Sequence, residues 1–410
     1  MRNSLYFLLP ALLLSLQLEA QKILLKERLN ADPAPLKIFT MGGSLSSGVQ
    51  NDGINKQFQS ESFAALLFKQ LNSGKFALPD FEPSETVNVK VDDYGTPVFE
   101  TEKKRILEGV DGIEFSKDIR SVHNFSVPFQ QIRTIGMKEG KYIAPNIDSR
   151  QFHYLSVLQS HNPDFSNSSY KDIFDLKVKE DFDFFIYELG FDDFLSYLKA
   201  GGYRISVGFL YSREPGMEQY LINNLASTAQ GVIINIPDPK DLPFFNILNN
   251  GHLEGLTSLD DFYIKVSDGT QTRRFDEKDL ILYNRELYPS LVNTSSSVGR
   301  NYETALTDQQ VLTSSELSKV QITVYNSKLS YLAKKKNLAV VDLYSLYKKI
   351  FRGEYVTHDG VKIDPSFPGR NFFSADGIFP SSLGHRVICN EIITTINAHY
   401  GLKIKYLPTI

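Results

Sequence analysis

The sequence predicts an α/β fold in which a parallel sheet carries helices on both faces. Short apolar runs rich in β-branched and aromatic residues alternate along the chain with segments of helical periodicity. The runs are continuously apolar, as in parallel strands buried on both faces. The expected strands are residues 37–41, 122–125, 182–189, 231–236 and 339–343. The expected helices are residues 60–71, 191–200, 217–229, 316–334 and 382–398.

Length and composition are those of one large globular domain. The chain has 410 residues, and its 44 basic and 48 acidic side chains give no reason to expect a nucleic-acid partner. Two segments do not fit a minimal alternating pattern: residues 75–118 are polar without a clear period, and residues 250–315 contain short strand-like runs. We expect a single domain over residues 21–410, in which these two segments are insertions that build a wall over the site.

The first twenty residues resemble an export signal. Arg2 precedes an apolar run at residues 5–18, and Leu18-Glu19-Ala20 is a plausible cleavage site. The run is shorter than the roughly 20 residues that span a membrane, although an uncleaved anchor is the alternative. Cys389 is the only cysteine, so no intramolecular disulfide can form. The predicted location is the periplasm, the cell envelope or the extracellular medium, with no stable membrane span after removal of the signal.

A serine follows the first expected strand in a tight glycine turn, Gly42-Gly43-Ser44-Leu45. Because ligand sites of parallel sheets form at the carboxyl ends of strands, Ser44 is a candidate nucleophile; the alternative is a helix N-cap. The segment contains neither the Gly-x-Ser-x-Gly elbow of α/β-hydrolases nor a phosphate-binding Walker loop. Asp192 and Asp193 lack the spacing of calcium ligands, so the sequence predicts no metal and no cofactor.

Four segments together resemble the SGNH, or GDSL, hydrolase family, over about residues 36–400 and in the family's order. That family has blocks of the form Gly-Asp-Ser-Leu, Asn-x-Gly-x-Pro-Gly, Gly-x-Asn-Asp and Asp-Gly-x-His-Pro. The matching segments are Gly42-Gly43-Ser44-Leu45, Asn124-Phe125-Ser126-Val127-Pro128-Phe129, Gly190-Phe191-Asp192-Asp193 and Asp376-Gly377-Ile378-Phe379-Pro380. The resemblance is to secreted bacterial members. It implies a flavodoxin-like three-layer fold and hydrolysis of lipid, acyl or acetyl esters.

The same resemblance assigns roles to individual positions. It implies that Ser44 stands at the nucleophile position and Asp376 at that of the triad acid, while Phe379 replaces the catalytic histidine. Ser126 and Asp192 stand at the oxyanion-hole positions, where the family has glycine and asparagine.

These replacements remove the chemistry of the family. Phe379 cannot accept a proton, and loss of a triad member costs on the order of 10⁴–10⁶ in turnover. An ionised Asp192 only accepts hydrogen bonds and would repel an oxyanion. Gly43 and Phe129 also depart from the blocks, where the family has aspartate and glycine. Without a histidine, Asp376 is expected to cap its Asp-Gly turn. The remaining histidines are expected to be surface polar residues: His123, His153, His161, His252, His358, His385 and His399.

Three functions follow as hypotheses. The first is a catalytically inactive protein that binds a ligand or partner in the old cleft. The second is an active serine esterase with a rearranged base. The third is a structural, envelope-associated interaction protein whose cleft is closed by Phe379 and Phe129. The ligand classes that the resemblance implies are small esters, acyl chains and acetylated glycans; the sequence names no protein partner.

Overall fold

The computed structural model describes most of the chain beyond the N-terminal segment. The predicted signal at residues 1–20 lies outside the described residues, as do His161, His252 and parts of both predicted insertions. The described residues are 36–71, 76–91, 97–102, 113–138, 147–159, 168–180, 182–202, 207–211, 216–248, 262–266, 269–284, 286–293, 295–368 and 371–409.

A four-stranded parallel sheet forms the centre of a mixed α/β fold. Its strands are β1 (Ile38–Gly42), β6 (Phe184–Glu188), β7 (Gln230–Ile234) and β12 (Ala339–Val341), in the order β1-β6-β7-β12. All residues of the first three strands are buried, which explains why their sequences are apolar without alternation. The alternating pattern therefore predicted these four strands and their parallel direction correctly.

The fifth expected strand, residues 122–125, lies along the free edge of β1 but is paired only through isolated bridges. His123 O accepts from Thr40 N at 2.9 Å, and Phe125 N donates to Thr40 O at 2.7 Å. On its other side, His123 N donates to Ala77 O at 2.9 Å. The segment delivers Ser126 beside the end of β1, which is the feature that matters for the site.

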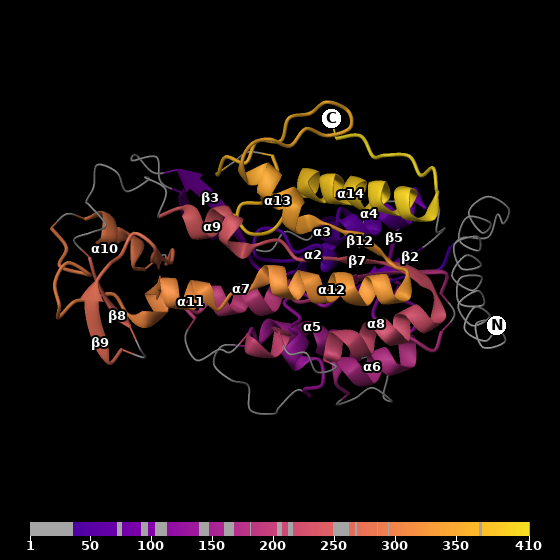
Figure 1. Ribbon diagram of the computed structural model, residues 1–410, viewed down its shortest axis with the longest axis horizontal. Helices are drawn as coiled ribbons and strands as arrows, with labels where there is room; N and C mark the ends of the chain where they lie inside the picture. The colour runs from indigo at the N-terminus through magenta and orange to yellow at the C-terminus, as the bar shows by residue number, and fades with distance from the viewer. Residues whose placement is uncertain are drawn as a thin grey trace, which may run out of the picture.

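Helices cover both faces of the sheet. Figure 1 shows α4 (Phe63–Gln70) and α14 (Ser382–Tyr400) on one side, with α8 (Met217–Thr228) and α12 (Ile322–Lys336) on the other. Both α12 and α14 pack against the edge strand β12. In the described part of the chain, no helix has the length and apolar character needed to cross a membrane.

The expected helix at residues 316–334 is two helices. The short α11 (Ser314–Ser318) begins at a capping box between Thr313 and Glu316, and α12 begins after a break. Val320 lies in the break and is buried, so the chain turns there to bring an apolar side chain into the core. The helical period of the sequence continues through the break, so the pattern predicted a single helix.

Several helices have no counterpart among the sequence predictions. They are α5 (Arg150–Gln159), α6 (Tyr170–Lys177) and α13 (Leu343–Phe351). In α13 the expected strand 339–343 gives way to a helix because the Asp342 side chain accepts from Ser345 N and so caps it. The short helices are α2 (Ser44–Ser47), α3 (Lys56–Ser60), α9 (Pro243–Asn246) and α10 (Tyr288–Val292).

The predicted insertions contain small two-stranded sheets. Phe99 of the first insertion packs against Tyr283 of the second, with their ring centroids 4.7 Å apart. The Phe99 ring centroid also lies 6.0 Å from that of Phe367. A separate apolar cluster in the second insertion is built around Phe262, Ile264 and Leu291. The pairs are β2 (Phe76–Pro79) with β5 (Ile113–Ser116), β3 (Thr86–Val91) with β4 (Pro97–Glu102), β8 (Tyr263–Val266) with β9 (Gln271–Arg274), and β10 (Leu280–Ile281) with β11 (Val311–Leu312).

Candidate functional site

Ser44 is the first residue of α2, directly after the glycine turn that ends β1. Its side chain is fully buried. Gly43 is required here because a Cβ at that position would lie 2.1 Å from Asp192 Oδ2. Gly43 and Asp192 therefore fit each other sterically.

The Ser44 hydroxyl both donates and accepts a hydrogen bond within the protein. It donates to Asp192 Oδ1 at 2.7 Å and accepts from the Phe129 N–H at 2.9 Å. Asp192 lies in the first turn of α7 (Phe191–Lys199), which follows β6, the strand beside β1. The sheet thus brings Ser44 and Asp192 together, but the arrangement holds the serine hydroxyl as a structural hydrogen-bonding group.

The backbone N–H groups of Ser44 and Ser126 also have acceptors within the protein. Ser44 N donates to Asp192 Oδ2 at 2.8 Å, so the backbone donor that would hold an oxyanion already holds a carboxyl oxygen. Ser126 N donates to Asn124 Oδ1 at 3.2 Å, and Ser126 Oγ accepts from Ser46 Oγ at 2.8 Å. The Ser44 N–H and hydroxyl are therefore both directed at Asp192, whereas Ser126 bonds to Asn124 and Ser46.

Three buried carboxyl groups surround this serine. Burial raises the pKa of Asp192 to about 7, although hydrogen bonds from Ser44 act in the opposite direction. Burial raises the pKa of Asp193 to about 7 and, with the neighbouring Asp192, that of Glu188 to about 8. Glu188 Oε2 accepts from Ser46 Oγ at 2.9 Å and from the Gly43 and Ser46 N–H groups at 3.2 Å each. Sequence reasoning missed Glu188; its only signal is a carboxylate at the end of an apolar strand.

Asp192 and Asp193 have a role beyond the helix dipole. In the structure Asp192 binds Ser44, and Asp193 Oδ2 accepts from Ile132 N at 2.8 Å. The two side chains therefore tie α7 to neighbouring loops rather than to its own first turn.

Asp376 holds backbone rather than a histidine. Its Oδ1 accepts from the N–H groups of Ile378 and Phe379 at 2.7 and 2.8 Å, which caps the Asp-Gly turn as expected. Its Oδ2 accepts from Asp52 N at 2.6 Å. The second contact is long-range and was not visible in the sequence. It joins the loop after Ser44 to the loop before α14.

Asp376→Asn is expected to lower the free energy of unfolding by about 1–3 kcal/mol, because its amide nitrogen would face the Asp52 N–H, donor against donor. Urea denaturation at pH 7.5 measures the change. Asp276→Asn is the matched control, since Asp276 is exposed and its carboxylate caps a local turn through Lys278 N. Equal losses in the two variants would show that the link to Asp52 contributes nothing.

Phe379 and Phe129 cover the serine. Phe379 is fully buried, with ring centroids 6.4 Å from Phe129 and 6.3 Å from Phe191, both edge to face. Phe129 has a left-handed backbone, with φ of 63°. Such a conformation is strained for a bulky residue. It is held by the bond from its N–H to Ser44 and by the Arg150 guanidinium, 3.6 Å from its ring centroid.

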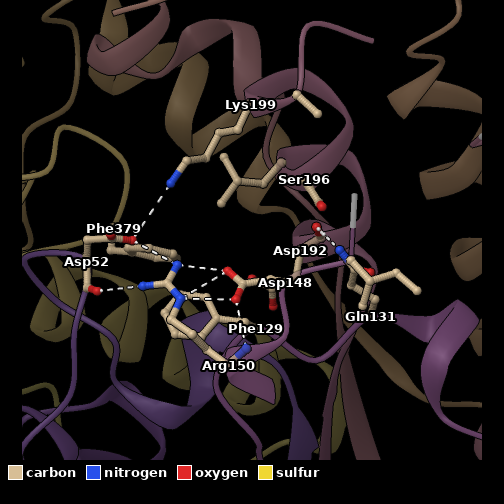
Figure 2. Close-up of a pocket in the computed structure, with 12 residues that line it drawn as sticks. Asp52, Phe129, Gln131, Asp148, Arg150, Asp192, Ser196, Lys199 and Phe379 are labelled. Atoms are coloured by element: carbon tan, nitrogen blue, oxygen red, sulfur yellow. Dashed lines mark hydrogen bonds and ion pairs between the residues drawn. The ribbon is translucent and has the colours of Figure 1, made fainter. Parts of the chain in front are cut away.

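A pocket of about 220 Å³ lies on the outer side of the two phenylalanines. Figure 2 shows Arg150 between Asp52 and Asp148, with Lys199 extending from α7 toward Asp52. Arg150 donates to Asp148 through Nε at 3.0 Å and through a terminal nitrogen at 2.8 Å, and to Asp52 Oδ1 at 3.3 Å. These four charged residues were not predicted, because no sequence motif unites positions from two loops and two helices.

Residues with a strained backbone are concentrated at this pocket. Four non-glycine residues of the described chain have φ in the left-handed region, and one of them, Asn337, caps helix α12. The other three are Phe129 and Asp52, which line the pocket, and Asn51, which precedes Asp52. Strained residues persist where surrounding contacts fix them and are concentrated at binding sites.

No described histidine contacts Ser44. His385, expected at the surface, is fully buried and accepts from Phe63 N at 3.4 Å; burial lowers its pKa to about 3. That expectation was wrong because the residue faces the core from α14. His123 Nδ1 accepts from Ala77 N at 3.0 Å, away from the serine. The others contact neighbouring groups: His153 with Tyr154, His358 with Thr394 and His399 with Asn337.

Comparison with known proteins identified no relative that could assign the site. No family model matches the chain, and no curated protein and no solved structure matches it either. The function has therefore to be argued from the site itself.

Proposed function

We propose that the chain is an SGNH-like protein that has lost hydrolysis and binds a small ligand in the pocket above its former serine centre. The strand order supports the kinship. If the segment at residues 122–125 is counted as the second strand, the order along the sheet is 2-1-3-4-5, that of flavodoxin-like folds. Ser44 follows the first of these strands and Asp192 the third, on either side of the point where the order reverses.

The observation that carries the loss of hydrolysis is the set of contacts at Ser44. A nucleophilic serine needs a base at its hydroxyl and free donors for the oxyanion. Here the hydroxyl donates to Asp192, a backbone N–H donates to the hydroxyl, and the Ser44 N–H binds the same carboxyl group. With no exposed surface on Ser44, an ester carbonyl has no path to its oxygen.

The proposed ligand function is supported by the pocket outside Phe129 and Phe379. The phenylalanines fill the space at Ser44, as the structural hypothesis expects, but a pocket with fixed charges and strained backbone lies outside them. A purely structural protein has no need to maintain strain at such a place. Export, which the N-terminal segment suggests, is kept as part of this proposal.

The wild-type protein is expected to show no turnover of p-nitrophenyl acetate above background, and Phe379→His with Asp192→Asn is expected to stay inert. The double substitution restores two family residues, but the Phe129 N–H and ring still cover Ser44. The assay is release of p-nitrophenolate, with circular dichroism to verify folding. Turnover by either protein that disappears on Ser44→Ala would instead support the active esterase.

Ligand binding is tested by thermal shift against defined sets of small molecules: carboxylates, amines, sugars, short acyl esters and amino acids. Ala200→Trp fills the pocket from its α7 side and is expected to abolish any stabilisation that the wild-type protein shows. Failure of all sets to stabilise the wild-type protein, or binding unchanged by Ala200→Trp, would contradict this proposal.

A further inference from the structure

The Asp52–Lys199 pair at the pocket rim is a loose ion pair. The distance from Lys199 Nζ to Asp52 Oδ1 is 3.8 Å, longer than a hydrogen bond, and in the described chain no side-chain contact of the Asp52 carboxylate is shorter than 3.3 Å. An ammonium group has three donors and a carboxylate about four acceptor sites. Both groups therefore keep hydrogen-bonding capacity that a bound molecule can use.

Asp52 is nevertheless fixed in place. Its strained backbone, with φ of 54°, is held through its N–H by Asp376 Oδ2, and Arg150 donates to its carbonyl oxygen at 3.1 Å. Burial acts to raise the pKa of Asp52, but the charges of Lys199 and Arg150 outweigh it and hold that pKa below its ordinary value. Asp52 is thus a permanently charged acceptor whose position is set before any ligand arrives.

The rest of the pocket is apolar beneath and electrically balanced at the rim. Phe129, Leu195 and Ile147 supply the apolar surface, and Phe379, which also lines the pocket, is fully buried. A volume of about 220 Å³, at about 30 Å³ per water molecule, holds about seven water-sized groups, so the ligand is a small molecule.

The rim charges decide between classes of ligand. At the rim two carboxylates, Asp52 and Asp148, stand against two cations, Arg150 and Lys199. A third carboxyl group, that of Asp192, also lines the pocket, where both of its oxygens accept hydrogen bonds from Ser44. A simple anion would face the carboxylates, and a simple cation would face Arg150 and Lys199. A molecule with both charges a few ångströms apart matches both halves of the loose pair at once.

We propose that the pocket binds a small apolar α-amino acid, whose ammonium group contacts Asp52, whose carboxylate contacts Lys199 and whose side chain lies on Phe129 and Leu195. This inference rests on the proposed ligand function of the same pocket. It makes Asp376, at the former triad position, a positioning residue for Asp52.

The test is isothermal titration calorimetry of the full chain with L-leucine at pH 7.5. N-acetyl-L-leucine, which lacks the ammonium group, and L-leucinamide, which lacks the carboxylate, are each expected to bind at least about tenfold more weakly, as is glycine. Asp52→Asn and Lys199→Gln are expected to weaken L-leucine binding by at least about tenfold as well. Lys335→Gln, a change in the last turn of α12 outside the pocket, is the control and is expected to leave binding within about twofold.

The outcomes separate this inference from the broader proposal. Equal binding of L-leucine and its two blocked forms, or L-leucine binding that survives both Asp52→Asn and Lys199→Gln, would overturn the amino-acid assignment. If another class of small molecule binds instead and Ala200→Trp abolishes that binding, the pocket is a ligand site but the assignment is wrong. If no set of molecules binds, both proposals fall.

Discussion

The free energy of unfolding is expected to fall by about 3 kcal/mol as the pH rises from 6.5 to 8. In this range Glu188, Asp192 and Asp193, with pKa values raised to about 8, 7 and 7, lose protons in the folded state. Unfolded carboxyl groups are already ionised at these pH values. The folded state therefore binds more protons than the unfolded state, and raising the pH favours unfolding.

The range begins at pH 6.5 because, below that pH, titration of His385 changes the free energy of unfolding in the opposite direction. Burial lowers the pKa of His385 to about 3, so between about pH 3 and 6.5 the unfolded state binds the extra proton. In that interval the histidine and the raised carboxyl groups partly cancel. Above pH 6.5 the unfolded-state histidine also loses its proton, so its opposing effect disappears over about one pH unit and the carboxyl groups dominate the decline.

Urea denaturation at half-unit pH steps measures this dependence, and Asp192→Asn locates its source. The variant is expected to reduce the fall by at least about 1 kcal/mol, because it removes one titrating group and a charge that raises the pKa of Glu188. Asp276→Asn, at an exposed turn, is expected to leave the slope unchanged. Stability that is constant or increasing from pH 6.5 to 8 would contradict the burial of these groups.

Phe379→Ala is expected to lower the free energy of unfolding by about 3–5 kcal/mol. The ring is fully buried between Phe129 and Phe191, and its removal leaves a cavity beside the strained Phe129 backbone. Phe351→Ala, at a 40% exposed position near the end of α13, is the matched control and is expected to cost less than half as much. Urea denaturation at pH 6.5 compares the two, and equal losses would mean that Phe379 is not a core residue.

Residues of the site could be identified from the sequence, but the hydrogen bonds that they make could not. The sequence placed Ser44 and Asp192 after expected strands, and the parallel sheet brings these two residues together. The replacements predicted a loss of chemistry. They did not reveal that the Asp192 carboxyl occupies the Ser44 N–H, because this depends on two helix starts meeting across neighbouring strands.

The pocket itself lay beyond sequence reasoning. Arg150 and Lys199 are surface-type residues on different helices, and Asp52 is in a turn that reads as an ordinary Asn-Asp-Gly connection. Contacts in the folded chain bring these residues together. Asp376 accepts a hydrogen bond from the Asp52 backbone, and Arg150 bridges Asp52 and Asp148 above Phe129. No local pattern encodes the contacts of Asp52, since they join residues 98 and 324 positions apart.

By itself the sequence determined the α/β alternation, the four buried parallel strands and the absence of a histidine three residues after Asp376. Apolar periodicity and residue identity are local properties and can be read along the chain. The tertiary structure alone decided that Ser44 is sealed, that Asp376 now positions Asp52 and that a charged pocket lies over the phenylalanine cover. Those properties depend on which groups meet in space, where burial changes the pKa of a carboxyl group and a single hydrogen bond fixes a strained backbone.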